Sequence, residues 1–182
     1  ERMNKKVSVK ALIQRVWQIT ASPNTEWNKI SEEQNSVFRT FVFPFVTTCC
    51  LIAFWGLLLN SFSFIVAVFE TLFLFFSMLG SICIVWKIDC FLVQNDDRLK
   101  NNLLKLVTYS FVPNFLLQTL MCYVPTMFFL KVLALYSIFV FLKGYDILAE
   151  EKNNNTLFIV INAILIVFLP WLLSFMCNKL WE

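Results

Sequence analysis

Four polar side chains stand inside long apolar stretches, and their types and spacing are the ones that favour chemistry. Glu70 and Lys131 carry opposite charges, while Asn114 and Gln118 are four residues apart and so share one face of a helix. Ionisable groups inside a membrane are costly and call for an explanation. We expect an inward-facing polar cluster of these four residues, with Glu70 and Lys131 as its ion pair.

Simpler alternatives are open for the same residues. Lys131 lies close to the expected end of its span, where a lysine can reach the membrane surface alone. Glu70 can be neutral in apolar surroundings. The cluster would line an ion or substrate pathway, or its members would only hold neighbouring helices together, as interhelical polar contacts often do.

Most enzyme chemistries are excluded by what the sequence lacks. It has no histidine, which rules out Ser-His-Asp and Cys-His arrangements and HExxH metal sites. Its three glycines form no phosphate-binding loop. The six cysteines include no CxxC pair and are expected to be small buried hydrophobes. We expect no enzyme, no catalytic residue, no metal, no cofactor and no nucleic-acid partner.

The elements that position these residues are expected to cross a membrane. The chain has 182 residues, of which 59% are hydrophobic and 15% charged, against roughly 25% charged residues in soluble domains. Its apolar stretches approach the ~20 residues that cross ~30 Å of hydrocarbon. The predicted fold class is an all-α polytopic membrane protein with five transmembrane helices, at about residues 37–59, 62–86, 103–124, 127–148 and 157–177.

An amphipathic cytoplasmic segment, residues 1–36, is predicted to precede this five-helix domain of residues 37–182. From Lys5 to Thr20, apolar residues recur at helical spacing beside basic ones, which is typical of a helix lying among lipid headgroups. Ser22-Pro23 then begins a second short helix that we expect to place Trp27 against the membrane surface. The predicted surface-binding or partner-binding residues are Lys6, Lys10, Arg15, Trp17 and Trp27. The alternative is that the first helix packs on the protein's own cytoplasmic loops.

The basic residues predict the orientation. Of the 15 lysines and arginines, all but Lys131 and Lys179 fall before or at the start of the first span, or on the side of the second and fourth loops. Because positive residues stay on the cytoplasmic side, the N-terminus is expected inside and the C-terminus outside. The turns Asn60-Ser61 and Pro125-Thr126 are short enough to make two tight hairpins.

The chain resembles the bacterial Yip1-domain family of five-pass membrane proteins over nearly its whole length. The start Ala11-Leu12-Ile13-x-Arg15-Val16-x-x-Ile19 is followed by Ser22-Pro23-x-Thr25-Glu26-Trp27-x-x-Ile30-x-Glu32-Glu33, of which Pro23 to Glu33 is the most specific part. Leu135-Tyr136-Ser137, Gly144, Leu148 and Lys152 are similar to the family's fourth span and the loop after it.

The resemblance implies a five-pass protein of the bacterial inner membrane without catalytic residues. Eukaryotic relatives work with Rab GTPases and in membrane shaping, but their Asp-Leu-Tyr-Gly-Pro motif is absent here, so Rab binding does not carry over. The main hypothesis is a non-enzymatic protein that organises membrane or binds a partner. Anionic lipid headgroups, another membrane or cytosolic protein, and a second copy of the chain are its candidate partners. The alternative is a small transporter or permeation protein that uses Glu70, Asn114, Gln118 and Lys131.

Overall fold

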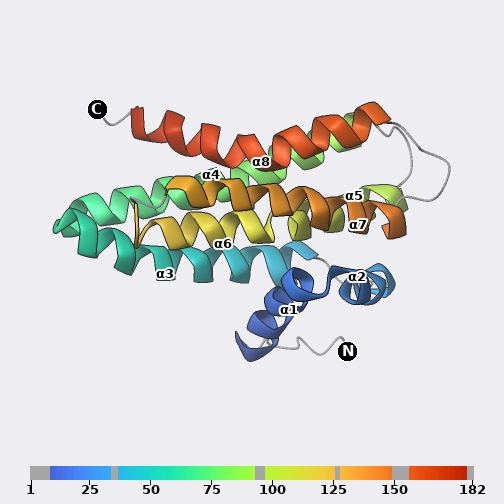
Figure 1. Ribbon diagram of the computed structural model, residues 1–182, viewed down its shortest axis with the longest axis horizontal. Coiled ribbons are helices and arrows are strands. Elements are labelled where there is room, and N and C mark those ends of the chain that lie inside the picture. Colours follow the sequence, from blue (N-terminus) through green and yellow to red (C-terminus); the bar gives the residue numbers. More distant parts are fainter. Residues whose placement is uncertain (1–8, 34–36, 93–96, 126–127, 149–155, 180–182) are drawn as a thin grey trace.

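The computed structural model is helical in the part of the chain that it describes, which is every residue except 1–8, 34–36, 93–96, 126–127, 149–155 and 180–182 (Figure 1). Two short helices come first, α1 (Val9–Ala21) and α2 (Pro23–Glu32). The others are α3 (Phe43–Ser61), α4 (Phe64–Leu92), α5 (Asp97–Ser110), α6 (Val112–Met121), α7 (Tyr136–Leu148) and α8 (Thr156–Lys179). The described residues contain no strand, and the predicted all-α class is confirmed.

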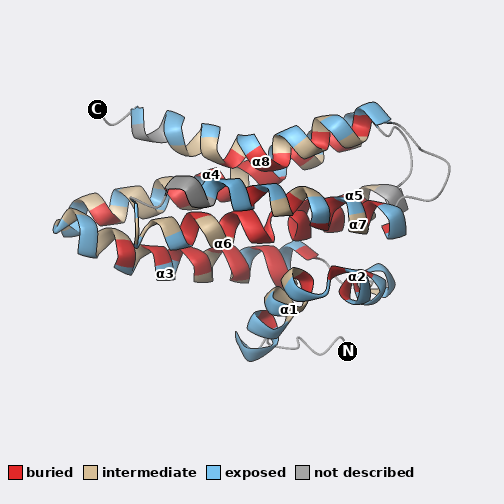
Figure 2. Ribbon diagram, in the orientation of Figure 1, coloured by how far each residue is buried: buried red, intermediate tan, exposed pale blue. Residues whose placement is uncertain are grey.

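The helices from α3 onward lie side by side along the long axis of the molecule, whereas α1 runs across it (Figure 1). Helix α4 packs on α3 and α8, and α7 packs on α2, α5 and α8. Helix α2 stands near one end of this bundle, and α1 lies beside the start of α3 (Figure 1). The turn between α3 and α4 and the end of α8 lie at the other (Figure 1). Buried residues concentrate where the helices face one another (Figure 2).

Three helical segments among the described residues are long and apolar enough to cross a membrane: Phe38–Ser61, Phe64–Leu92 and Thr156–Met176. They fall where the first, second and fifth spans were predicted. The second is longer than expected. It continues beyond residue 86 to Leu92, and its 29 residues make a helix of about 43 Å at 1.5 Å per residue.

Prolines shape two of the remaining segments. The first span begins with a π-helical turn, η1 (Phe38–Val42), in which the Phe43 N–H bonds to the carbonyl of Phe38, five residues back. Pro44 follows directly and has no N–H with which to continue the usual ladder. The predicted third span is divided at Phe111 into α5 and α6, with Pro113 in the first turn of α6. The predicted fourth begins as a 3₁₀-helix, η2 (Phe128–Leu135), which runs directly into α7.

Trp27 attaches α2 to the bundle. Its side chain is completely buried, and its indole N–H donates to the carbonyl of Val140 in α7 at 3.0 Å. The ring lies against Gly144, and it meets Tyr109 of α5 edge to face at 5.8 Å between centroids. The prediction that Trp27 lies on the membrane surface is therefore wrong. A buried indole needs a hydrogen-bond acceptor, and α7 supplies one next to a glycine.

The carboxyl-terminal ends of α1 and α2 are capped by side chains from the bundle. The ammonium of Lys105, itself buried, donates to the carbonyls of Ile30 at 2.9 Å, Ser31 at 3.4 Å and Glu33 at 2.5 Å. The Tyr136 hydroxyl donates to the carbonyl of Thr20 at 2.7 Å. Helix ends leave unpaired carbonyls, and a cation is favourable there. The short helices thus share one continuous core with the bundle.

Replacing Gly144 by alanine tests this attachment. A Cβ there would lie 2.5 Å from two ring atoms of Trp27 and 2.8 Å from Leu106, so the indole must move. We expect the free energy of unfolding in detergent to fall by about 1–3 kcal/mol, as for other overpacked cores. Gly80→Ala is the matched control, because its nearest neighbour, Leu173, is 3.6 Å away. Equal stability of the two variants would contradict the assigned role of Trp27.

Candidate functional site

Arg15 on α1 is engaged within the protein. Its Nη1 donates to Glu33 at 3.0 Å, a second guanidinium nitrogen pairs with the same carboxylate, and its Nε lies 3.4 Å from Glu26. Lys29 completes the network through Glu26 at 3.0 Å. Burial alone would lower the pKa of Arg15, but its hydrogen bond to Glu33 and the nearby negative charges raise it overall. Arg15 thus clamps α1 to α2 and is not directed toward lipid headgroups as predicted.

The predicted apolar face of α1 is only partly buried: some of its residues pack on the protein and the others are exposed. Leu12 and Ile19 are buried against the protein. Val9, Ile13 and Trp17 are 64%, 59% and 72% exposed. An amphipathic helix that only packed on its own protein would bury this second group. The exposed group therefore forms an uncovered apolar strip, which we call the α1 strip.

Of the predicted surface-binding residues, Lys10 and Trp17 are exposed on α1. Lys6 lies outside the described residues. Arg15 and Trp27 instead hold the short helices in place.

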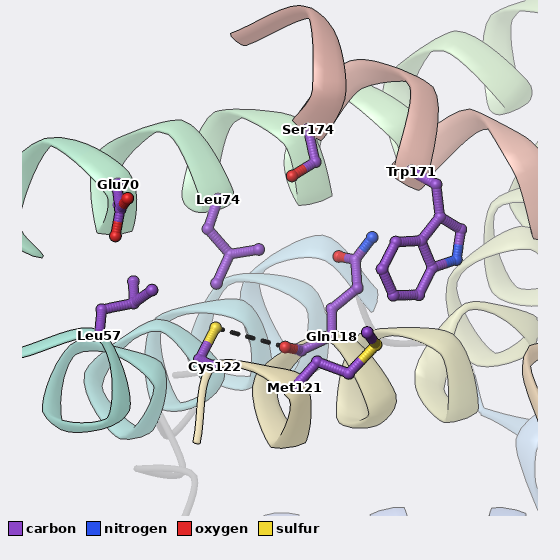
Figure 3. Close-up of a pocket in the computed structure, with 8 residues that line it drawn as sticks. All are labelled: Leu57, Glu70, Leu74, Gln118, Met121, Cys122, Trp171 and Ser174. Carbon is purple, nitrogen blue, oxygen red and sulfur yellow. Dashed lines mark hydrogen bonds between the residues drawn. The ribbon is translucent and has the colours of Figure 1, made fainter. Parts of the chain in front are cut away.

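A cavity of about 190 Å³ opens between α3, α4, α6 and α8 at the end of the bundle away from α1. Its lining includes Glu70 of α4 and Gln118 of α6, which stand on different walls (Figure 3). The other residues that line it are Leu57, Leu74, Met121, Cys122, Trp171 and Ser174. Two members of the predicted polar cluster therefore meet at one cavity.

The other two members do not line this cavity, and the predicted ion pair is not formed. The described residues contain no contact within 4.0 Å between the Glu70 carboxylate and the Lys131 ammonium. Lys131 is exposed, and its Nζ stands over the ring of Trp171 at 4.7 Å from the centroid. Similar depth along two helices does not bring two side chains together unless both helices also turn them toward each other.

Asn114 lies deeper in the bundle, where it donates hydrogen bonds to the backbone of α8. Its Nδ2 donates to the carbonyl of Ile166 at 2.8 Å and lies 3.3 Å from that of Val167. Pro170 is four residues after Ile166 and has no N–H, so the Ile166 carbonyl has no donor within its own helix. The Ser77 hydroxyl of α4 donates to the carbonyl of Pro170 at 3.0 Å. These bonds hold α4 and α6 to the bend in α8.

A buried pair of polar side chains links α4 to α8, and it was not predicted from the sequence. Asn162 of α8 donates through Nδ2 to Oδ1 of Asp89 in α4 at 2.8 Å, and both residues are fully buried. Asp89 was overlooked because the second span was expected to end at residue 86. Asn162, a polar residue in the first third of the fifth span, was the signal that could have revealed the pair.

The buried core shared by all the helices, the three spanning segments and the paired polar groups define a polytopic, all-helical integral membrane protein. The model of the Yip1 domain matches residues 17–175, so the chain belongs to the Yip1 family. The matched region starts at Trp17, within α1, and continues into α8. Comparison with curated proteins and with solved structures gives no match.

The pairing of Asn114 with the proline bend predicts a specific rescue. Asn114→Leu leaves the Ile166 carbonyl without a donor in an apolar core, so we expect the free energy of unfolding to fall by about 1–3 kcal/mol. Adding Pro170→Ala restores a backbone N–H for that carbonyl and should recover most of the loss. Chemical unfolding in micelles of the wild type, both single variants and the double variant gives the coupling. If the effects of Asn114→Leu and Pro170→Ala on the free energy of unfolding are additive, the bond from Asn114 to the Ile166 carbonyl is not the cause of the loss.

Proposed function

We propose that this protein is a non-enzymatic organiser of the bacterial cytoplasmic membrane that inserts the α1 strip into the inner leaflet. The observation that carries the proposal is the strip itself: Val9, Ile13 and Trp17 are exposed on a helix that is otherwise fixed to the bundle. In water, exposure of such residues side by side is unfavourable, whereas at a headgroup boundary it stabilises binding.

The order of faces around α1 supports this position. At about 100° per residue, the buried face of Leu12 and Ile19 is followed by the strip and then by Lys10, Gln14 and Gln18. A helix lying beside a membrane bundle meets protein, lipid and water in this order. Helix α1 also runs across the bundle axis near the start of the first span, as a helix in the interface would (Figure 1).

Charge supports the same orientation. Lys10 borders the α1 strip, where a lysine can extend to anionic phosphates while its stem stays on the apolar boundary. We infer that α3, α4, α5 with α6, η2 with α7, and α8 make five crossings. The N-terminus is then cytoplasmic and the C-terminus outside, since the basic residues collect at the end that carries α1 and α2.

A small transporter or permeation protein is the second candidate, and the cavity between Glu70 and Gln118 favours it. The deeper polar residues fit it less well, because Asn114 bonds to the α8 backbone and Asp89 to Asn162. Loss of ion or solute flux from proteoliposomes on Glu70→Gln, with folding intact, would support this candidate.

The organising role predicts an effect on vesicle shape. Full-length protein reconstituted with anionic lipid should shift vesicles to smaller diameters, measured by cryo-electron microscopy. Ile13→Asp/Trp17→Asp should abolish the shift, because each buried apolar side chain contributes about 1.5–3 kcal/mol to insertion. Gln14→Asp/Gln18→Asp adds the same charge on the polar face of α1, which is turned toward water, and should keep most of the shift. Equal loss in both variants would count against the strip.

Crosslinking shows whether the α1 strip contacts lipid or a protein partner. A benzophenone amino acid at Trp17 in cells should give lipid adducts, and the same group at Gln14 should give few. Protein adducts at Trp17 would instead assign the strip to a protein partner.

A further inference from the structure

The cavity at the far end of the bundle has polar groups with no protein partner. Gln118 is 4% exposed, and neither its Nε2 nor its Oε1 has a hydrogen-bond partner in the described part of the chain. The amide points into the space among Leu74, Trp171 and Ser174 (Figure 3). A buried amide without partners is destabilising by about 1–3 kcal/mol, so a ligand that satisfies it would be favoured.

Charges of both signs flank the same space. Glu70 contributes a carboxylate to the wall, and the described residues give it no ion pair. Lys131 does not line the cavity itself, but its ammonium stands over the ring of Trp171, which does. Because the two charges do not neutralise each other directly, a ligand that carries one charge of each sign would complement both.

The cavity has the size of a small headgroup. Its volume of about 190 Å³ is several times the space that a single water molecule needs. This accommodates an ammonium on a two-carbon arm and part of a phosphate. Apolar side chains also line it, namely Leu57, Leu74, Met121 and Trp171, so its polar groups are surrounded by apolar ones.

We propose that this cavity binds the headgroup of an ethanolamine phospholipid from the leaflet opposite α1. The primary ammonium donates to the Glu70 carboxylate and to Oε1 of Gln118, and Lys131 pairs with the phosphate. A choline headgroup lacks N–H donors and would leave Oε1 of Gln118 unsatisfied. A glycerol headgroup lacks the positive charge for Glu70.

Native mass spectrometry of the full-length protein tests the site with dioleoyl lipids that differ only in headgroup. We expect the wild type to retain phosphatidylethanolamine over phosphatidylcholine and phosphatidylglycerol. Glu70→Gln and Lys131→Gln should each reduce its retention about tenfold, as expected for loss of a charge-assisted contact. Glu32→Gln, at the other end of the bundle, and Lys179→Gln, whose ammonium lies over Phe175, are the matched controls.

Three results would overturn the proposal: equal retention of the three lipids, full retention by Glu70→Gln, or displacement of the lipid by soluble phosphoethanolamine. If Glu70→Gln fails to fold, the wild type still tests the proposal: it should retain ethanolamine lipid in preference to choline lipid. Ile13→Asp/Trp17→Asp should retain the lipid normally, so failure of this proposal is distinguishable from failure of the organising role of α1.

Discussion

The structure depends on pairing every backbone polar group inside the bundle, because hydrocarbon offers no water to replace a missing bond. Pro170 removes one donor from α8 and leaves the Ile166 carbonyl open. Asn114 of α6 supplies that donor, and Ser77 of α4 binds the carbonyl of Pro170 itself. The proline bend in α8 is therefore also the point at which three helices are fixed together.

The same constraint operates at the helix ends. Lys105 brings a buried ammonium to the last carbonyls of α2. At the opposite end, Asn60 in the last turn of α3 donates to the carbonyls of Gly56 at 2.9 Å and Cys122 at 2.8 Å. Gly56 permits this approach, since a Cβ there would lie 2.9 Å from the backbone of Cys122. Close contacts between distant segments thus occur where a carbonyl needs a donor and a small residue leaves room.

Hydropathy predicted the positions of the helical segments well, because burial in lipid requires about the same apolar length everywhere. It could not predict rotation about each helix axis. Glu70 and Lys131 were expected to pair from their depths alone, yet Lys131 faces Trp171. Trp27 looked like a surface residue because its acceptor, Val140, and its glycine, Gly144, are far along the chain. The residues next to Trp27 in the sequence do not reveal these distant contacts. Without them, a tryptophan beside a predicted span is interpreted as an interfacial anchor.

The buried contacts of the short helices determine what α1 can do. A free amphipathic helix turns about its own axis to match any surface, so binding costs it orientational freedom. Here the Arg15 clamp and the Tyr136 bond to the end of α1 fix its rotation, while Trp27 fixes α2. The α1 strip is thereby presented in one direction relative to the spans. In the proposed function, insertion of a strip held in this way would displace lipid beside the bundle on one leaflet only, and such asymmetry bends a membrane. A loosely tethered helix with the same residues would bind lipid but transmit little of that force to the bundle.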